Sequence, residues 1–143
     1  MLIRISFTPP QSRWKENLTT EIPLDTRAYS QAKANHILIE KSRRQLSLLQ
    51  GNRVFRQYPI AIGKPGTPTP VGNFAIAVKV VNPGGVLGTR WLGLNYDTYG
   101  IHGTNRPWLI GQQVSNGCIR MHNSHVEELF GLTFVGTPVA IRD

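Results

Sequence analysis

The chain has 143 residues, of which 40% are hydrophobic and 17% are charged. This length and composition suit one globular domain and exclude a low-complexity chain. Because the 14 glycines and 10 prolines favour turns between short strands, we expect mostly β structure. The net charge of +8 is scattered and forms no basic stripe with interleaved aromatic residues, which argues against nucleic-acid binding. It favours a solvated basic surface, or contact with an anionic cell-wall polymer or an anionic membrane surface.

Residues 1–34 are predicted to form an N-terminal arm or extended segment, because they contain several prolines and no sustained hydrophobic period. The first ten residues lack the apolar run of about 7–15 residues that a secretory signal needs, so no signal peptide is predicted. No stretch approaches the roughly 20 apolar residues of a transmembrane helix. Residues 35–143 are therefore expected to be the functional domain.

Short strands are predicted along most of that domain. Strand-like runs occupy residues 36–40, 45–50, 53–62, 73–81, 90–94, 99–102 and 137–141. Gly51 and Asn52 give a two-residue hairpin turn, and Pro59 indicates an edge strand or a bulge. The alternating prolines and glycines of residues 63–72 predict a rigid irregular loop.

One short helix is predicted at residues 124–131. Ser124 and Glu127 have the spacing of a capping box, and Gly131 suits the position after the last helical residue. The apolar face of this helix is expected to consist of Val126, Leu129 and Phe130.

Cys118 is the only cysteine, so an intramolecular disulfide is excluded and a nucleophilic role is favoured over that of a small buried hydrophobe. His102 ends a predicted strand and Cys118 begins another short element, so the two can face one cleft. A neighbouring histidine can stabilise the cysteine thiolate. Gly117 is expected to let a substrate carbonyl approach, while the Cys118 N–H points at the developing oxyanion.

The distribution of acidic residues limits the alternatives. Between Glu40 and Glu127 the only carboxylate is Asp97, which excludes the paired carboxylates of a glycosidase from this segment. A backbone carbonyl is therefore the expected orienting partner of His102, with Asp97 as a second candidate.

A zinc site is a further alternative. His122 and His125 follow Cys118 closely, and together with His102 they would supply the nitrogen and sulfur ligands that zinc prefers. The spacing matches no recognised zinc pattern, however, and the basic Arg120 lies within it. We therefore predict no metal ligand and no cofactor.

Two separated motifs resemble the YkuD-type L,D-transpeptidase catalytic domain. They are His102-Gly103-Thr104 and Ser115-x-Gly117-Cys118-Ile119-Arg120-Met121, the second followed by Asn123. Residues 69–74 also resemble the Thr-Pro-x-Gly-x-Phe segment with which a strand of that family begins. The resemblance covers residues 35–143. Position 116 is Asn where many members have His.

The resemblance implies a mostly β sandwich with one short helix after the catalytic cysteine. It also implies a cysteine acyltransferase, a carbapenem target, that acts on the tetrapeptide stems of peptidoglycan at the cell wall or spore envelope, with L,D-carboxypeptidase activity as a side reaction. Cys118 would be the nucleophile, His102 the general base and Gly117 part of the active-site backbone. The expected substrate-binding residues are Ser115, Asn116, Arg120, Gly103 and Thr104. A catalytically weak wall-binding module of the same fold is the main alternative.

Overall fold

The computed structural model describes residues 35–143, so the predicted N-terminal arm lies outside the described residues. The strands are β1 (Asn35–Glu40), β2 (Gln45–Gln50), β3 (Arg53–Pro59), β4 (Ile62–Gly63), β5 (Gly72–Val81), β6 (Arg90–Leu94), β7 (Gly100–His102), β8 (Gln113–Ser115), β9 (Ile119–Arg120) and β10 (Pro138–Arg142). Helix α2 (Asn123–Gly131) lies between β9 and β10, and two short 3-10 turns, η1 (Gly85–Leu87) and η2 (Pro107–Leu109), occur in the loops.

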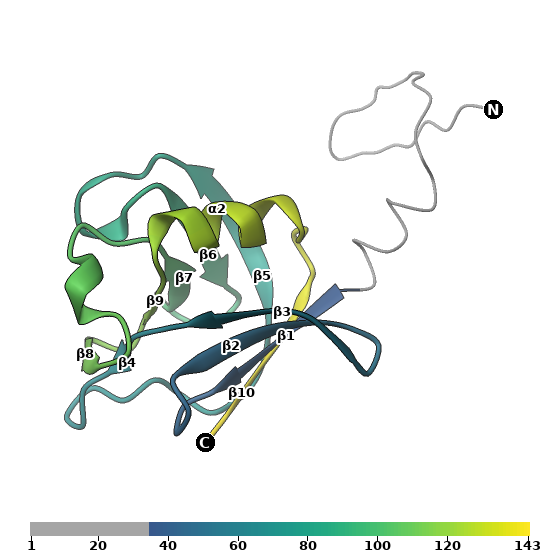
Figure 1. Cartoon of the computed structure of the whole chain (residues 1–143), viewed down its shortest axis with the longest axis horizontal. Helices are drawn as coiled ribbons and strands as arrows, with labels where there is room; N and C mark the ends of the chain where they lie inside the picture. The colour runs from purple at the N-terminus through teal and green to yellow at the C-terminus, as the bar shows by residue number, and fades with distance from the viewer. Residues whose placement is uncertain (1–34) are drawn as a thin grey trace. The chain divides into compact units, whose positions relative to one another are not determined.

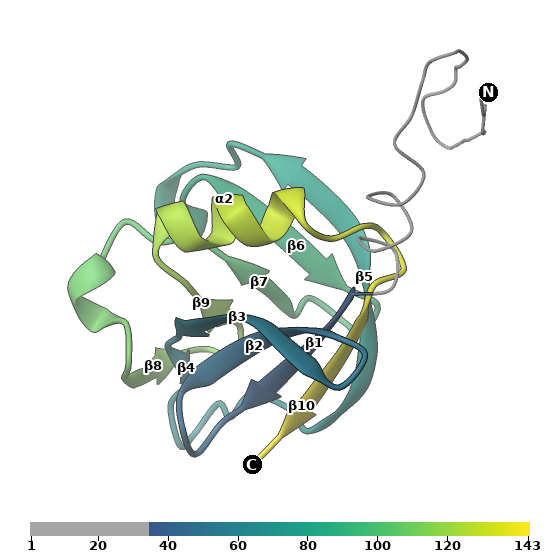
Figure 2. The same cartoon turned by 45° about the vertical axis from the view of Figure 1, so that its right-hand side comes forward.

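Eight strands form one curled sheet in the order β3-β2-β1-β10-β5-β6-β7-β9, and β4 pairs with β8 in a second, smaller sheet. Figures 1 and 2 show β1, β2, β3 and β10 as one wall and β6, β7 and β9 as the other, with the long β5 joining them. The mostly β fold, with a helix after the cysteine, is therefore confirmed. The expected sandwich consists of a sheet that folds back on itself.

The core lies between these walls and is formed by buried side chains, which alternate with more exposed ones along strands such as β1. Ile37 and Ile39 of β1 are fully buried, with partly exposed residues between and after them. Ile37 is opposite Leu48 on one side and Val139 on the other. This two-residue period is the signature of a strand with one buried face, and it fixes the register of the first wall.

Helix α2 packs against β6 and β7 with Val126 and Leu129 buried. The predicted capping box is wrong: the helix begins after His122, no side chain caps its first turn, and Ser124 lies inside it. The predicted end is also wrong, since Gly131 is the last helical residue. Lys79 supplies hydrogen bonds at the C-terminal end of the helix. Its Nζ donates to the carbonyl groups of Phe130 and Thr133, each at 2.7 Å.

The predicted strand at residues 53–62 is divided in two. β3 ends at Pro59 and forms the edge of the large sheet, as that proline indicated. The chain then crosses to the small sheet, where Ile62 is opposite Gln113 of β8. Predicting one continuous strand was wrong because Pro59 has no N–H to donate to a ladder.

Within residues 35–143, no helix combines the length and the apolar character needed to cross a membrane.

Replacing Ile101 by Ala should lower the free energy of unfolding by about 2–5 kcal/mol, the usual cost of an aliphatic truncation in a core. Ile101 is fully buried in β7 between Leu92 and Ile119. Urea denaturation of the purified protein measures this change. Val86→Ala, at a side chain that is 62% exposed, is the control. Equal losses in the two variants would contradict a packed core at β7.

Candidate active site

Two neighbouring parallel strands bring His102 and Cys118 to the same part of the sheet. His102 ends β7, and Cys118 immediately precedes β9. Ile101 is opposite Ile119 in this pair, and both are fully buried. His102 is opposite Arg120. The prediction that His102 ends a strand is therefore confirmed, whereas Cys118 lies one residue before the next strand and does not begin it.

The Cys118 thiol is partly exposed, and its Sγ donates to the carbonyl group of Thr98 over 3.8 Å. Burial raises the pKa of this thiol above its ordinary value. A hydrogen bond with the backbone of Gly100 and the positive charge of Arg120 lower the pKa, but their effects are smaller. Burial therefore opposes ionisation of the thiol in the protein without substrate.

The His102 ring is 4% exposed and is stacked on Trp91, with 5.8 Å between the ring centroids. Its Nδ1 lies 2.6 Å from the carbonyl oxygen of Gly103. Because a carbonyl only accepts, Nδ1 carries the proton and Nε2 keeps a free electron pair. Burial, above all, lowers the His102 pKa to about 4, with a smaller lowering by Arg120. The expected backbone contact is present. Among residues 35–143, Asp97 forms no hydrogen bond or ion pair with His102.

The loop before Cys118 is held by its own side chains. The buried Ser115 hydroxyl donates to the Cys118 carbonyl (2.6 Å) and accepts from the Gly117 N–H (3.0 Å), so it supports the loop. Gly117 has φ of 121°, and a side chain there would collide with the Tyr99 ring. Tyr99 thus fills the side of Gly117 on which a side chain would lie. The expected approach of a substrate carbonyl at this glycine stays a prediction. Asn116 is exposed at the tip of the loop.

Gly103 and Thr104 are buried behind His102, where Asn123 holds them. The Asn123 Oδ1 accepts from the N–H groups of Thr104 (3.0 Å) and Thr89 (3.2 Å), while its Nδ2 donates to the Thr104 carbonyl (3.0 Å). A side chain at Gly103 would collide with Asn123 Oδ1. These contacts support the end of β7, and the substrate-binding roles of Gly103 and Thr104 stay predictions.

Arg120 is half-buried beside the reactive pair. Its backbone pairs with Ala61 through two hydrogen bonds of 2.9 and 3.0 Å, which fix its position. Its charge acts on both His102 and Cys118. Arg120 takes no part in the ion pairs found among residues 35–143, which join Lys41 with Asp143, Arg43 with Glu40 and Arg56 with Glu128.

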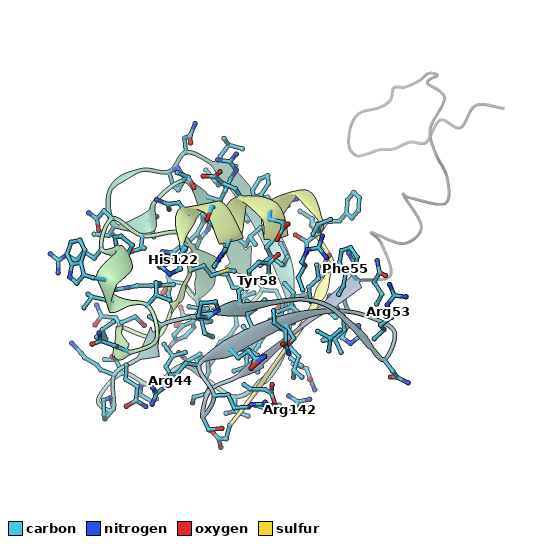
Figure 3. The ribbon with its side chains drawn as sticks, in the orientation of Figure 1. Arg44, Arg53, Phe55, Tyr58, His122 and Arg142 are labelled. Atoms are coloured by element: carbon cyan, nitrogen blue, oxygen red, sulfur yellow. The ribbon has the colours of Figure 1, made fainter. Side chains whose placement is uncertain are left out.

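The residues of the zinc hypothesis do not form a metal site. The rings of His122 and His125 lie 5.2 Å apart, and His125 packs on Tyr58 at 5.1 Å. Figure 3 shows Tyr58 and His122 near α2. No group of three or more His, Cys, Asp or Glu side chains in the described part of the chain is placed to hold an ion. The described residues here supply a thiol and a neutral imidazole from adjacent parts of two paired strands.

Four residues that shape the site were not predicted from the sequence. They are Trp91 against His102, Tyr99 against Gly117, Asn123 against Thr104, and Thr69, whose hydroxyl donates to the Gly117 carbonyl at 2.8 Å. Thr69 and Asn123 belong to the quoted motifs, which was the available signal. Nothing local in the sequence indicated the two aromatic contacts.

The curled sheet, with its cysteine and histidine on adjacent strands, places the protein in the class of L,D-transpeptidase folds. The catalytic domain of the Enterococcus faecium L,D-transpeptidase superposes with a TM-score of 0.67 at 26% identity, covering 76% of this chain and 96% of that domain. The LD transpeptidase LdtMt1, solved in complex with imipenem, shares the fold at 20% identity with a TM-score of 0.66, covering 76% of this chain and 59% of that one.

The chain belongs to the YkuD family, because the family model described as an L,D-transpeptidase catalytic domain matches residues 34–141. The YkuD protein of Bacillus subtilis (strain 168), which is named as a candidate L,D-transpeptidase, is 50% identical over 107 residues. That match covers 75% of this chain and 65% of the relative, so the chain spans somewhat less than two thirds of its length.

We expect His102 to be a neutral imidazole protonated at Nδ1 when the pH is near the ordinary histidine pKa of about 6.5. The reason is that burial lowers its pKa to about 4. Side-chain nitrogen chemical shifts in NMR report both the charge and the tautomer, and the His102→Gln variant identifies the signals. An imidazolium at that pH would instead contradict the lowered pKa of His102.

Proposed function

We propose that residues 35–143 form a peptidoglycan L,D-transpeptidase with Cys118 as nucleophile and His102 as general base. One observation carries the proposal: the Gly103 carbonyl holds His102 in the tautomer whose Nε2 can accept a proton, on the strand beside Cys118. Membership of the family supports an acyl-transfer enzyme. The proposed donor substrate is a tetrapeptide stem that ends in D-alanine.

In the first half of the proposed reaction, the Cys118 thiol gives its proton to His102 Nε2 while Sγ attacks the carbonyl carbon of the third stem residue. The Cys118 N–H, in the backbone next to Gly117, stabilises the negative charge on the carbonyl oxygen. The C–N bond to D-alanine then breaks, and His102 returns the proton to the leaving amine. A thioester on Cys118 results.

In the second half, an amine from a neighbouring stem attacks the thioester carbonyl and gives a proton to His102. The C–S bond breaks, the thiolate takes the proton back, and an amide cross-link remains. Water in place of the amine releases a tripeptide, which is the L,D-carboxypeptidase reaction. All proton transfers in this scheme use His102, and no cofactor enters it.

Arg120 is the proposed binding site for the stem's terminal carboxylate. It is half-buried, it lies beside both reactive groups, and it has no ion pair with another described residue. A guanidinium can bind a carboxylate through two parallel hydrogen bonds. Exposed Asn116 is a second proposed contact, whereas Ser115, Gly103 and Thr104 would act mainly by holding the backbone.

The proposed place of action is the cell wall or spore envelope, where peptidoglycan stems occur. The formal charge of +8 supports an association with anionic wall polymers through long-range attraction.

Incubation with a tetrapeptide stem should release D-alanine and add a tripeptide acyl group to Cys118. Intact-protein mass spectrometry and peptide mapping measure the adduct. Cys118→Ala should form no adduct, because it lacks the nucleophile, and Cys118→Ser should retain almost nothing, since a hydroxyl is far less ionised than a thiol. Stem binding without acylation of the unchanged protein would favour a wall-binding module.

A carbapenem should acylate Cys118, because its strained lactam carbonyl imitates the donor amide. The expected rate falls on the order of 10²-fold or more in His102→Ala, which lacks the general base. His122→Ala is the matched control, since this histidine lies outside the reactive pair, and it should keep the rate. An adduct on another residue, or equal rates in the two histidine variants, would contradict the proposed mechanism.

A further inference from the structure

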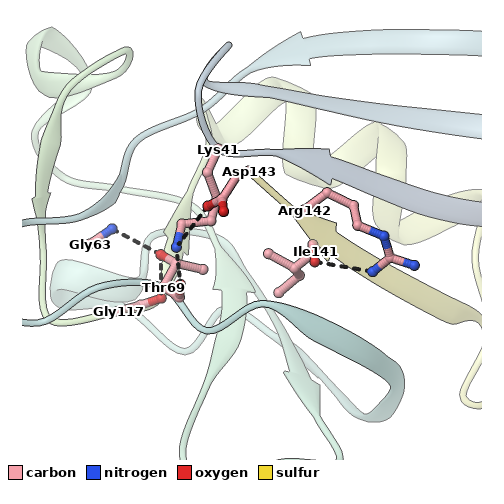
Figure 4. A network of polar contacts seen from close by, with 7 residues as sticks. All are labelled: Lys41, Gly63, Thr69, Gly117, Ile141, Arg142 and Asp143. Carbon is pink, nitrogen blue, oxygen red and sulfur yellow. Dashed lines mark hydrogen bonds and ion pairs between the residues drawn. The ribbon is translucent and has the colours of Figure 1, made fainter.

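Thr69 forms a buried link between the proline-rich loop and the peptide unit that joins Gly117 to Cys118. Thr69 is only 1% exposed to solvent. The hydroxyl accepts a hydrogen bond from the Gly63 N–H at 2.9 Å and donates its proton to the Gly117 carbonyl at 2.8 Å. Figure 4 shows Thr69 between these two partners. Its single proton is thus committed to Gly117.

The Gly117 carbonyl and the Cys118 N–H belong to the same peptide unit. Because that unit is planar and trans, its C=O and N–H point in opposite directions. A hydrogen bond that fixes the direction of the carbonyl therefore also fixes the direction of the N–H. Gly117 makes such control necessary, since glycine has wide backbone freedom and here adopts φ of 121°.

We propose that Thr69 is a positioning residue that aims the Cys118 N–H at the oxygen on which negative charge develops during acylation. This inference rests on the proposed function, in which that N–H stabilises the oxyanion. Thr69 touches neither the substrate nor the reacting atoms, and it acts through the Gly117 carbonyl.

Thr69 is itself held firmly enough to direct a peptide. The Lys41 ammonium donates to the Thr69 carbonyl (Figure 4). Gly63 lies so close to the chain at Thr67 and Thr69 that a side chain at this glycine would collide with their backbone atoms. Pro68 and Pro70 flank Thr69 and restrict its backbone further. The link therefore joins two constrained segments.

The same loop also supplies a matched control. The Thr67 hydroxyl donates to the Ser115 carbonyl at 2.8 Å, but this carbonyl also accepts from the Lys64 N–H at 3.0 Å. Removing the Thr67 hydroxyl deletes a bond of the same kind, between the same two segments. It leaves the Gly117–Cys118 peptide unit and its partner in place.

Two reactions of Cys118 distinguish a positioning role of Thr69 from a role in which Thr69 only supports the loop. Acylation by a carbapenem forms the Sγ–C bond, breaks the lactam C–N bond and moves the thiol proton by way of His102 to the lactam nitrogen. It passes through an oxyanion. Alkylation by iodoacetamide forms an Sγ–C bond at a saturated carbon and releases iodide and a proton, and no oxyanion forms. Only the first reaction needs the aimed N–H.

The experiment compares both rates in the unchanged protein and in Thr69→Val, Thr69→Ser and Thr67→Val. We expect Thr69→Val to lower the acylation rate about 10- to 100-fold, part of the usual loss of 10²–10³ when an oxyanion donor is deleted. Its alkylation rate should be unchanged. Thr69→Ser, which keeps the hydroxyl, should restore acylation, and Thr67→Val should cause a much smaller loss.

Thr69→Ala replaces Thr69→Val if the latter does not fold, because alanine puts no methyl group against the Gly63 N–H. Equal losses in acylation and alkylation would overturn the inference in favour of a structural role, as would unchanged acylation in a folded Thr69→Val or Thr69→Ala protein. Failure of the unchanged protein to be acylated at all would instead refute the proposed function, so the two failures are distinguishable.

Discussion

The parallel pairing of β7 with β9 is the constraint on which the site depends. Ile101 and Ile119 are opposite each other and fully buried, so the pair has one register in which both side chains reach the core. A slip by one residue would turn an isoleucine toward the opposite face. The same slip would move Cys118 relative to His102. Core packing therefore sets the positions of two reactive residues that are 16 apart in the sequence.

Burial also decides the resting charge of these residues. It lowers the pKa of His102 and raises that of Cys118, and both effects favour the neutral form. Arg120 favours a thiolate but disfavours an imidazolium, so its charge does not stabilise the ion pair as a whole. In the proposed reaction, this charge would instead favour states that add only negative charge, such as a bound carboxylate or an oxyanion. Proton transfer from the thiol is therefore expected to be coupled to the attack on the substrate in that proposed reaction.

Features that depend on the local residue pattern could be predicted from the sequence. Features that depend on a contact with a residue distant in the sequence could not. Strand periodicity and the Pro59 edge were predictable, and so was the pairing of a cysteine with a histidine. The capping box failed because the helix begins one residue before Ser124, where Asn123 is held by Thr104 and Thr89. The raised pKa of Cys118 follows from burial, which only the folded chain shows.

Side chains complete the backbone bonding where the strands of the site are too short to do so. β7 has three residues and β9 has two, so their ladder alone leaves the adjoining loops unsupported. Ser115, Thr69 and Asn123 supply the missing partners, each from a small polar side chain directed at backbone groups beside Cys118 or His102. Polar residues of a conspicuous motif therefore need not face the substrate. Among residues 35–143, Asn116 is exposed and Arg120 forms no ion pair.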